Sequence, residues 1–191
     1  MKIKGPGESP LLLLNVIKVL GKYRIPYAIV GAFAASFYGL VRASLDADAV
    51  ISLEGNEKRL PQILSDLKKG SLKVVCRQGD VHDPIRCVIH IKDRYQNRVD
   101  LLIGIRGMEQ NAFKRVIKAS FMNTSIKIIG AEDFIAMKIF AGSAKDMQDA
   151  VGVLNVCAKN IDMPLLKQLT LQYGKKELAK LKRILSKQKK E

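Results

Sequence analysis

The chain has no tryptophan, and its 191 residues include only 5 Tyr and 6 Phe. Proteins that bind several bases of a single strand at once need a series of stacking rings. The scarcity of rings therefore argues against a multi-base stacking platform. Functions that depend on charge or on a compact polar site remain open.

Cysteine is equally scarce. Cys76, Cys87 and Cys157 are odd in number and include no CxxC pair. A disulfide framework and a structural zinc site are not expected, because both need paired cysteines at defined spacing. Free thiols in a reducing compartment are the default interpretation, so we expect a cytoplasmic protein.

No apolar run is long enough to span a bilayer. Residues 11–14 are all leucine, but Asn15 and Lys18 interrupt the apolar sequence that follows. A membrane helix needs about 20 apolar residues, so no membrane partner is expected. A buried helix fits better, with Ser9 predicted as its N-cap and Pro10 as its first helical residue.

Acidic residues are outnumbered, because 18 Asp and Glu stand against 33 Lys and Arg, giving a formal net charge of +15. This excess favours an anionic partner, such as a nucleic acid, a nucleotide or an acidic protein. An ordinary protein with lysines on its outer faces is the alternative. Part of the excess lies in residues 173–191, a predicted helix that could present cations to RNA or simply remain solvated.

Apolar periodicity predicts a mixed α/β region followed by helices. Predicted helices cover residues 9–23, 32–40, 56–69, 109–118, 132–142, 145–159, 164–173 and 175–188. Predicted strands cover residues 27–30, 46–51, 72–76, 85–92, 98–103 and 125–129. The strands 85–92 and 98–103 should form a hairpin. We expect residues 1–130 to form a core, with a helical region of residues 131–191 packed against it.

Three aspartates occupy positions that suit a metal site. Asp46 and Asp48 are two residues apart at the start of a predicted strand, so their side chains point to the same face. If the strand that carries Asp100 is its neighbour, the third carboxylate lies about 5 Å away. Three hard oxygen ligands suit Mg²⁺ or Mn²⁺, ions that also bind substrate phosphates.

The segment upstream of these aspartates makes the pattern more specific. Gly31 lies where a strand gives way to a helix, which lets backbone N–H groups approach phosphates. The segment VGAFAASFYGLVRASLDADAVI resembles the core motif of the nucleotidyltransferase superfamily, and RVDLLIG supplies the third carboxylate. The spacing is similar to that of minimal nucleotidyltransferases related to AbiEii-type abortive-infection toxins, through Gly31, Ala34, Gly39, Arg42, Ser44, Asp46 and Asp48.

This resemblance implies a polymerase-β-like α/β (α+β) core that moves a nucleoside monophosphate from a nucleoside triphosphate to an acceptor hydroxyl. Asp46, Asp48 and Asp100 would hold Mg²⁺ or Mn²⁺ and be catalytic, with Asp100 as the base. The triphosphate would be bound by Gly31, Ala32, Arg42, Ser44, Lys138 and Lys145. RNA, especially a tRNA end, is the first candidate acceptor, while a protein hydroxyl or a small molecule such as an aminoglycoside stays open, as does a toxin–antitoxin role.

Some positions depart from the motif or allow a second interpretation. Ala32 stands where the motif has Gly or Ser, so a non-catalytic nucleotide- or RNA-binding protein, or an antitoxin-type partner, is the alternative. Lys138 and Lys145 share a helical face only if the helix continues between them, and Lys145 with Asp149 could be an ordinary surface pair. His90 lies in an apolar strand and is interpreted as a core histidine.

Overall fold

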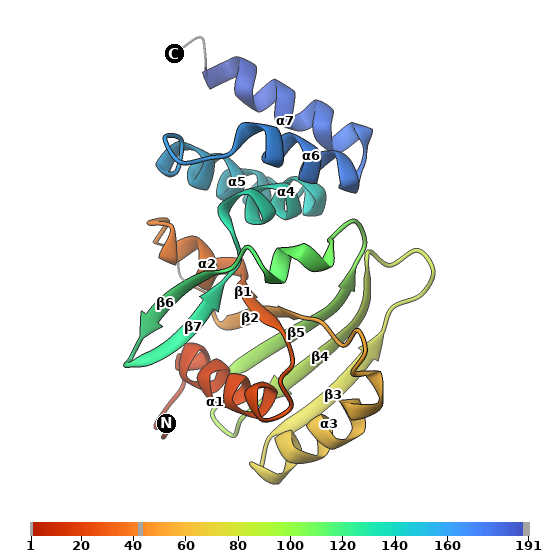
Figure 1. The fold of residues 1–191 in the computed structure, drawn as a ribbon. Coiled ribbons are helices and arrows are strands. Elements are labelled where there is room, and N and C mark those ends of the chain that lie inside the picture. The colour runs from red at the N-terminus through yellow and green to blue at the C-terminus, as the bar shows by residue number, and fades with distance from the viewer. Residues whose placement is uncertain (1, 42–43, 189–191) are drawn as a thin grey trace.

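The computed structural model describes residues 2–41 and 44–188. Within these residues the chain forms one mixed sheet of seven strands in the order β3-β4-β5-β2-β1-β7-β6 (Figure 1). The strands are β1 (Tyr27–Val30), β2 (Asp46–Ile51), β3 (Lys73–Gln78), β4 (Ile85–Lys92), β5 (Arg98–Ile105), β6 (Ile117–Phe121) and β7 (Thr124–Ile128). The predicted α/β class is therefore confirmed.

Helices pack on the sheet and follow it in the chain. They are α1 (Ser9–Lys22), α2 (Gly31–Phe37), α3 (Leu60–Lys69), α4 (Ala131–Ala141), α5 (Ala144–Val156), α6 (Met163–Tyr173) and α7 (Lys175–Gln188), with short 3-10 turns at Glu57–Arg59 and Gln110–Phe113. In Figure 1, α1 and α3 lie on the same side of the sheet, and α4 to α7 stack on one another at one end of the molecule. Among the described helices, none combines the length and the apolar content needed to cross a bilayer.

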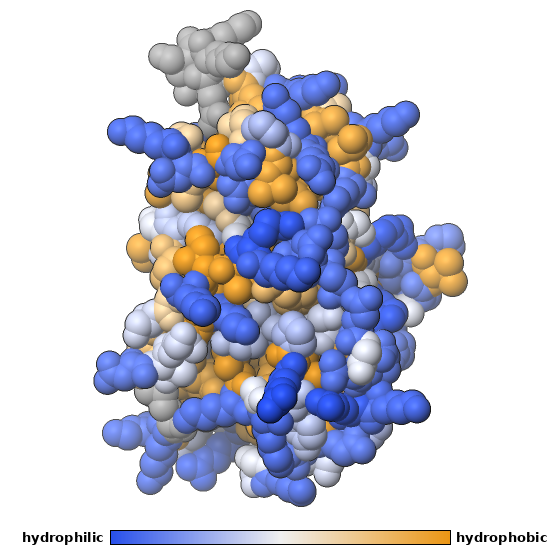
Figure 2. All heavy atoms as spheres, in the orientation of Figure 1, coloured by the Kyte–Doolittle hydropathy of each residue, from blue (hydrophilic) through white to orange (hydrophobic). Residues whose placement is uncertain are grey.

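The alternation of side chains along the central strands separates a core face from an open face. Cys87, Ile89 and Ile91 of β4 are at most 4% exposed, whereas the residues between them are partly exposed. In β2, Ala47 and Ala49 are buried in the same core. Because side chains of a strand alternate between faces, Asp46 and Asp48 must lie on the opposite, open face. Figure 2 shows mostly hydrophilic side chains on the visible side, with hydrophobic ones in separate patches.

The strand register brings the predicted carboxylates together. β2 pairs with β5 in parallel, so that Asp48 lies beside Asp100 and Asp46 beside Arg98. β4 pairs with β5 as an antiparallel hairpin, as expected, and places His90 beside Asp100. One row across the sheet therefore contains Asp48, Asp100 and His90 on the same face.

The prediction of a helix over residues 109–118 is wrong. Residues 110–113 form a single 3-10 turn, and β6 begins at Ile117. β6 pairs with β7 through a two-residue turn in which Met122 and Asn123 both have positive φ. Such turns match the twist of a hairpin, and the pairing with β7 overrides the weak helical preference of the sequence before it.

The predicted cap at the first helix is also wrong. Ser9 is the first residue of α1, Glu8 is the N-cap, and no side chain caps the helix there. The Ser9 hydroxyl instead donates to the carbonyl of Leu45 at 2.6 Å and accepts from the backbone N–H of Arg98 at 3.0 Å. A buried hydroxyl that joins the starts of β2 and β5 cannot also serve the helix terminus.

Other boundaries differ by a few residues. The helix predicted over 32–40 ends at Phe37, before Gly39 with its φ of +90°. The helix predicted over 145–159 ends at Val156, and the strand predicted over 72–76 continues to Gln78. α4 to α7 follow the last strand, and the division into a core and a helical region at residue 130 stays a prediction.

Candidate active site

Three carboxylates converge on the open face of the sheet. Asp46, Asp48 and Asp100 each offer one oxygen, and these oxygens all lie within 4.8 Å of one another. The three residues come from adjacent parallel strands, so backbone hydrogen bonds fix their spacing. The convergence expected from the two-residue spacing and the neighbouring strand is present.

Gly31 allows the middle carboxylate to lie where it does. Gly31 begins α2 directly after β1 and has a φ of +65°. A Cβ placed on this residue would be 2.2 Å from Oδ2 of Asp48. Only glycine combines this backbone conformation with such a close approach. Ala32 is the next residue of α2 and is buried.

Asp48 is partly buried and lies close to both of the other acids. Burial raises its pKa to about 6, and the neighbouring charges of Asp46 and Asp100 add to the effect. Lys138 and Arg98 oppose it through their positive charges. A partly buried carboxylate beside two others is poorly stabilised by protein groups alone, so this site favours a bound cation.

Arg98 provides part of that positive charge. Its Nη2 lies 2.7 Å from Oδ2 of Asp46 and 3.4 Å from Oδ2 of Asp100. Ser44 donates a hydrogen bond of 2.5 Å to Oδ1 of Asp46. Partial burial alone would raise the pKa of Asp46, but the Ser44 hydrogen bond and the Arg98 charge outweigh it and lower the pKa. Asp46 is therefore ionised over the whole neutral range.

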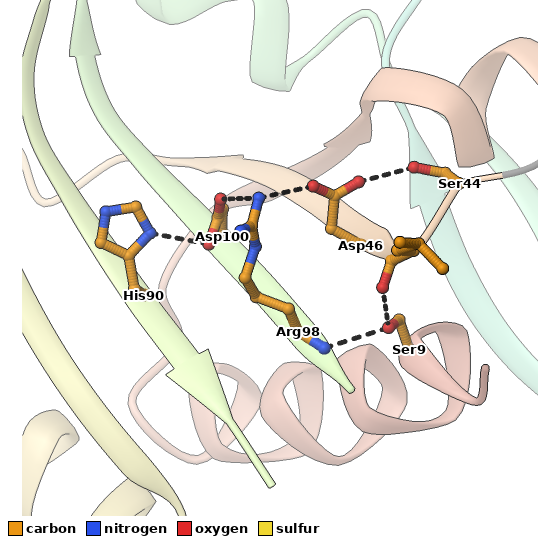
Figure 3. Close-up of polar contacts among 7 residues, drawn as sticks. Ser9, Ser44, Asp46, His90, Arg98 and Asp100 are labelled. Atoms are coloured by element: carbon orange, nitrogen blue, oxygen red, sulfur yellow. Dashed lines mark hydrogen bonds and ion pairs between the residues drawn. The ribbon is translucent and has the colours of Figure 1, made fainter. Parts of the chain in front are cut away.

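His90 contacts the third acid. Its Nδ1 lies 2.8 Å from Oδ1 of Asp100, and Figure 3 shows His90 and Arg98 on two sides of that carboxylate. The side chain of His90 is 35% exposed, so it is not the core histidine that the apolar strand suggested. Sequence reasoning did not assign His90 or Arg98 to the site. The hairpin register could have done so, since it pairs His90 with Asp100 and Lys92 with Arg98.

A cavity of about 260 Å³ opens beside Asp48, between the sheet and α4. Its walls are largely apolar and include Leu102 of β5 together with Met137 and Phe140 of α4. Lys138 of α4 and Asp146 of α5 also line the cavity. A space with apolar walls and the charged groups Asp48, Lys138 and Asp146 suits a ligand that has both a polar and an apolar part.

Lys138 is fixed at this cavity by two acids of α5. Its Nζ lies 2.7 Å from Asp146 and 2.9 Å from Asp149. Burial alone would raise the pKa of Asp146, but hydrogen bonds from Lys138 and Ser143 outweigh it and lower the pKa. The lysine side chain is only 10% exposed, so its position is set by these pairs rather than by solvent.

The other predicted phosphate-binding residues are distributed differently. α4 ends before Gly142, whose φ is +71°, and α5 begins after Ser143 as its N-cap. The helix therefore does not continue from Lys138 to Lys145, and Lys145 is exposed on α5. Ser44 lies at the site through Asp46. Arg42 lies outside the described residues.

The donor set fits a hard divalent cation. Three carboxylate oxygens within 4.8 Å, with Asp100 buried and Asp48 close to both other acids, match the oxygen ligands that Mg²⁺ and Mn²⁺ prefer. The residues available to hold such an ion are Asp46, Asp48 and Asp100. Arg98 lies between two of them and supplies positive charge to the same carboxylates.

Solved structures share this architecture. No protein-family model and no curated protein matches the sequence. The solution structure of the antibiotic-resistance factor ANT(2'')-Ia is similar with a TM-score of 0.59 at 12% identity, covering 91% of this chain and 94% of that chain. The crystal structure of ANT(2'')-Ia in complex with adenylyl-2''-tobramycin gives a TM-score of 0.58 at 11% identity, covering 85% and 95%. A putative nucleotidyltransferase from Thermotoga maritima gives 0.55 at 14% identity, covering 80% and 96%.

The chain therefore has the nucleotidyltransferase fold, as the resemblance in its sequence predicted. At identities between 11 and 14%, the similarity of these structures shows a shared fold alone. The finer likeness to AbiEii-type toxins stays a prediction.

Proposed function

We propose that the protein transfers a nucleoside monophosphate from a nucleoside triphosphate to an acceptor hydroxyl, with Mg²⁺ or Mn²⁺ as the cofactor. The observation that carries this proposal is the convergence of Asp46, Asp48 and Asp100 beside Gly31 on one open face. The nucleotidyltransferase fold supports it, because a structure of this fold, that of ANT(2'')-Ia, holds adenylyl-2''-tobramycin, a molecule that carries a group of the transferred type.

The residues around the three acids supply distinct parts of the reaction. Gly31 and Ala32 begin α2, where backbone N–H groups have no partner within the helix and can donate to phosphate oxygens. Lys138 lines the cavity beside Asp48, where a triphosphate would compete with Asp146 and Asp149 for its positive charge. The apolar wall of that cavity, formed in part by Leu102 and Met137, would take the base and sugar. A bound divalent ion would neutralise phosphate charge as pyrophosphate leaves.

Asp100 is the proposed general base. The acceptor oxygen attacks the α-phosphorus, the bond to pyrophosphate breaks, and the acceptor proton moves to a carboxylate oxygen of Asp100. His90 contacts Oδ1 of that carboxylate, which orients it on the face open to an acceptor. The products are a nucleotidylated acceptor and pyrophosphate.

The acceptor we favour is an RNA hydroxyl, in particular a tRNA end. The net charge of +15 supports a polyanionic acceptor over a neutral one. A protein hydroxyl and a small molecule are the other acceptors that this chemistry allows. If the modified RNA or protein is essential to the cell, the transfer would be toxic, and the protein could then act as the toxin of a toxin–antitoxin pair.

A second candidate is a protein that binds nucleotide or RNA without catalysis, including an antitoxin-type partner. Two observations favour it. Ala32 provides no hydroxyl at the start of α2, and the guanidinium of Arg98 already neutralises part of the charge of Asp46 and Asp100. In that case the three acids would bind metal weakly and transfer nothing.

A thermal-shift measurement with Mg²⁺ and each nucleoside triphosphate separates the two. For a transferase, Mg²⁺ and the triphosphate should stabilise the protein together more than either does alone. Asp48→Asn should abolish this coupling, and Asp80→Asn in the exposed 79–84 loop is the matched control that should keep it. Incubation with labelled triphosphates and total cellular RNA or protein would then identify the acceptor by the position of the label. Failure of wild-type protein to bind Mg²⁺ and triphosphate together would exclude the transferase.

A further inference from the structure

The open face of the sheet extends well beyond the three acids. β3, β4 and β5 continue from the site to the edge of the sheet, since the order runs β2, β5, β4, β3. The core faces of these strands are closed by buried residues such as Ile89 and Leu101. On the opposite face, side chains of β3 and β4 are partly or fully exposed. A continuous surface therefore leads from Asp46 and Asp100 to the edge strand.

A row of cations crosses this surface. The register places Lys73 of β3 beside Lys92 of β4, Lys92 beside Arg98 of β5, and Arg98 beside Asp46 of β2. Neighbouring strands are about 4.8 Å apart, so the three cations extend over roughly 10 Å in a straight line from the metal-binding acids. Within the described residues, no ion pair is recorded for Lys73 or Lys92, whereas Arg98 pairs with Asp46 at 2.7 Å.

A second row runs parallel to the first, two residues further along each strand. It consists of Val75 of β3, His90 of β4 and Asp100 of β5. Val75 is 47% exposed, and the side chain of His90 is 35% exposed. The two rows are separated by about 6.6 Å, the rise of two strand residues. One row offers positive charge, and the other offers an apolar side chain and a flat ring.

This pairing of rows matches one class of ligand. Proteins that bind single-stranded nucleic acid place cations along the backbone and a ring or apolar group against a base. An acidic peptide would use the cations, but it carries a ring only where its sequence includes an aromatic residue, whereas every nucleotide carries one. A small uncharged acceptor would use neither row beyond Asp100. His90 is the one histidine of these two rows and can stack on one base, which agrees with a chain that has no tryptophan.

We propose that the face carrying Lys73, Lys92, Val75 and His90 binds the 3′ end of a single-stranded nucleic acid as the acceptor. The backbone lies along the lysines, the terminal base lies against His90, and the terminal hydroxyl reaches Asp100. This inference rests on the proposed function, because it identifies the acceptor of the same site. It predicts little base preference, since neither row offers a set of hydrogen-bonding groups that reads a base edge.

The test uses the full chain and a fluorescein-labelled single-stranded RNA of about 12 nucleotides, a length within the range one such surface covers. Affinity is measured by fluorescence anisotropy over a series of salt concentrations. The double variant Lys73→Gln/Lys92→Gln should reduce the magnitude of the slope of log affinity against log salt by about 1.4, the value for two phosphate contacts on a single strand. The control Lys118→Gln/Lys167→Gln removes two exposed charges on β6 and α6 and should leave the slope unchanged.

Four outcomes of the binding measurements would overturn the proposal. The first is a wild-type slope for the Lys73/Lys92 variant. The second is an equal loss for the control variant, which would indicate general attraction by a basic protein. The third is competition by polyglutamate as effective as competition by unlabelled RNA, which would point to an acidic protein instead. If Lys176→Gln/Lys182→Gln in α7 removes binding while the Lys73/Lys92 variant retains it, the RNA surface is α7 and the proposal is again overturned.

The same variants distinguish this inference from the proposed function. Binding of Mg²⁺ and triphosphate, measured by thermal shift, should be the same in the Lys73/Lys92 variant as in wild type, because neither lysine lines the cavity beside Asp48. Loss of RNA binding with retained Mg²⁺–triphosphate binding supports the surface. Unchanged RNA binding with retained Mg²⁺–triphosphate binding overturns the surface and leaves the transferase standing. RNA blocked by a 3′ phosphate should bind but accept no label, and labelling of the blocked RNA would contradict the 3′-end placement.

Discussion

Gly31 and Asp48 approach each other so closely that no other residue fits at position 31. A Cβ there would lie 2.2 Å from Oδ2 and 3.1 Å from Cγ of Asp48. The φ of +65° at Gly31 adds a second constraint, because side chains other than glycine are strained in this region. This close approach therefore sets the position of the start of α2 relative to Asp48, the acid at the centre of the proposed metal site.

The variant Gly31→Ala should displace the Asp48 carboxylate. We expect a loss of stability of about 1–3 kcal/mol from backbone strain and the clash, together with loss of Mg²⁺–triphosphate coupling. Gly21→Ala in α1 is the control, because a Cβ at Gly21 has nothing within 4 Å and alanine favours a helix. Chemical unfolding and thermal shift would measure both effects. Full Mg²⁺–triphosphate coupling in Gly31→Ala would contradict the role assigned to this contact.

The raised pKa of Asp48 makes the metal-free protein less stable as the pH increases. In the folded state this pKa is about 6, against an ordinary value of 3.8 for an aspartate, so the folded state binds more protons between these values. Stability should therefore fall as the pH rises from about 4 to 6, and the ionised group costs roughly 3 kcal/mol at pH 7. Without metal, Asp48→Asn should be more stable than wild type at pH 7, and the difference should shrink towards pH 4. Denaturant unfolding at several pH values with a chelator would measure it, with Asp80→Asn as the control.

Much of this site follows from local sequence patterns. Strands 27–30, 46–51 and 85–92 have the predicted bounds, because their apolar and polar residues alternate with the period of a half-buried strand or form a short buried run. Asp46 and Asp48 share a face by that same period. Asp100 joins them because β2 and β5 are neighbours, which the family resemblance implied.

The remainder depends on contacts that local patterns do not encode. The position of His90 beside Asp100 depends on the register of the β4–β5 hairpin, which the turn with Gln96 at positive φ sets. β6 forms only because β7 offers it a partner, so the residues before it were interpreted as a helix. The role of Ser9 depends on the approach of Leu45 and Arg98, which lie 36 and 89 residues away in the chain.

Arg98 acts as a counterion for the acids when no metal is bound. Its Nη2 contacts Asp46 at 2.7 Å and Asp100 at 3.4 Å, and its side chain is 41% exposed. Arg98→Met should lower the stability of the metal-free protein by about 1 kcal/mol, a modest value because solvent screens the pair. It should also raise the pKa of Asp46, since the arginine charge helps to lower it.

The same variant should respond more strongly to Mg²⁺ than wild type does, because the ion replaces a missing positive charge rather than adding to one already present. Melting curves with and without Mg²⁺ would measure this difference. Arg94→Met is the matched control, because Arg94 is exposed in the β4–β5 turn and contacts Tyr95. An equal or smaller Mg²⁺ response in Arg98→Met than in wild type would argue against the counterion role.

Ser9 joins the starts of the two strands that carry the acids. Its side chain is buried, and its hydroxyl contacts the Leu45 carbonyl and the Arg98 N–H. Ser9→Ala would leave both backbone groups without this partner, at a cost of about 1–3 kcal/mol. Urea unfolding should show a lower midpoint at an unchanged slope. Ser65→Ala on the exposed face of α3 is the control and should change stability by less than about 0.5 kcal/mol. The N–H that Ser9 accepts belongs to Arg98, the residue that pairs with Asp46 and Asp100, so Ser9→Ala should also reduce the thermal shift produced by Mg²⁺ and triphosphate. An unchanged thermal shift would mean that the starts of β2 and β5 hold the three acids in place without Ser9.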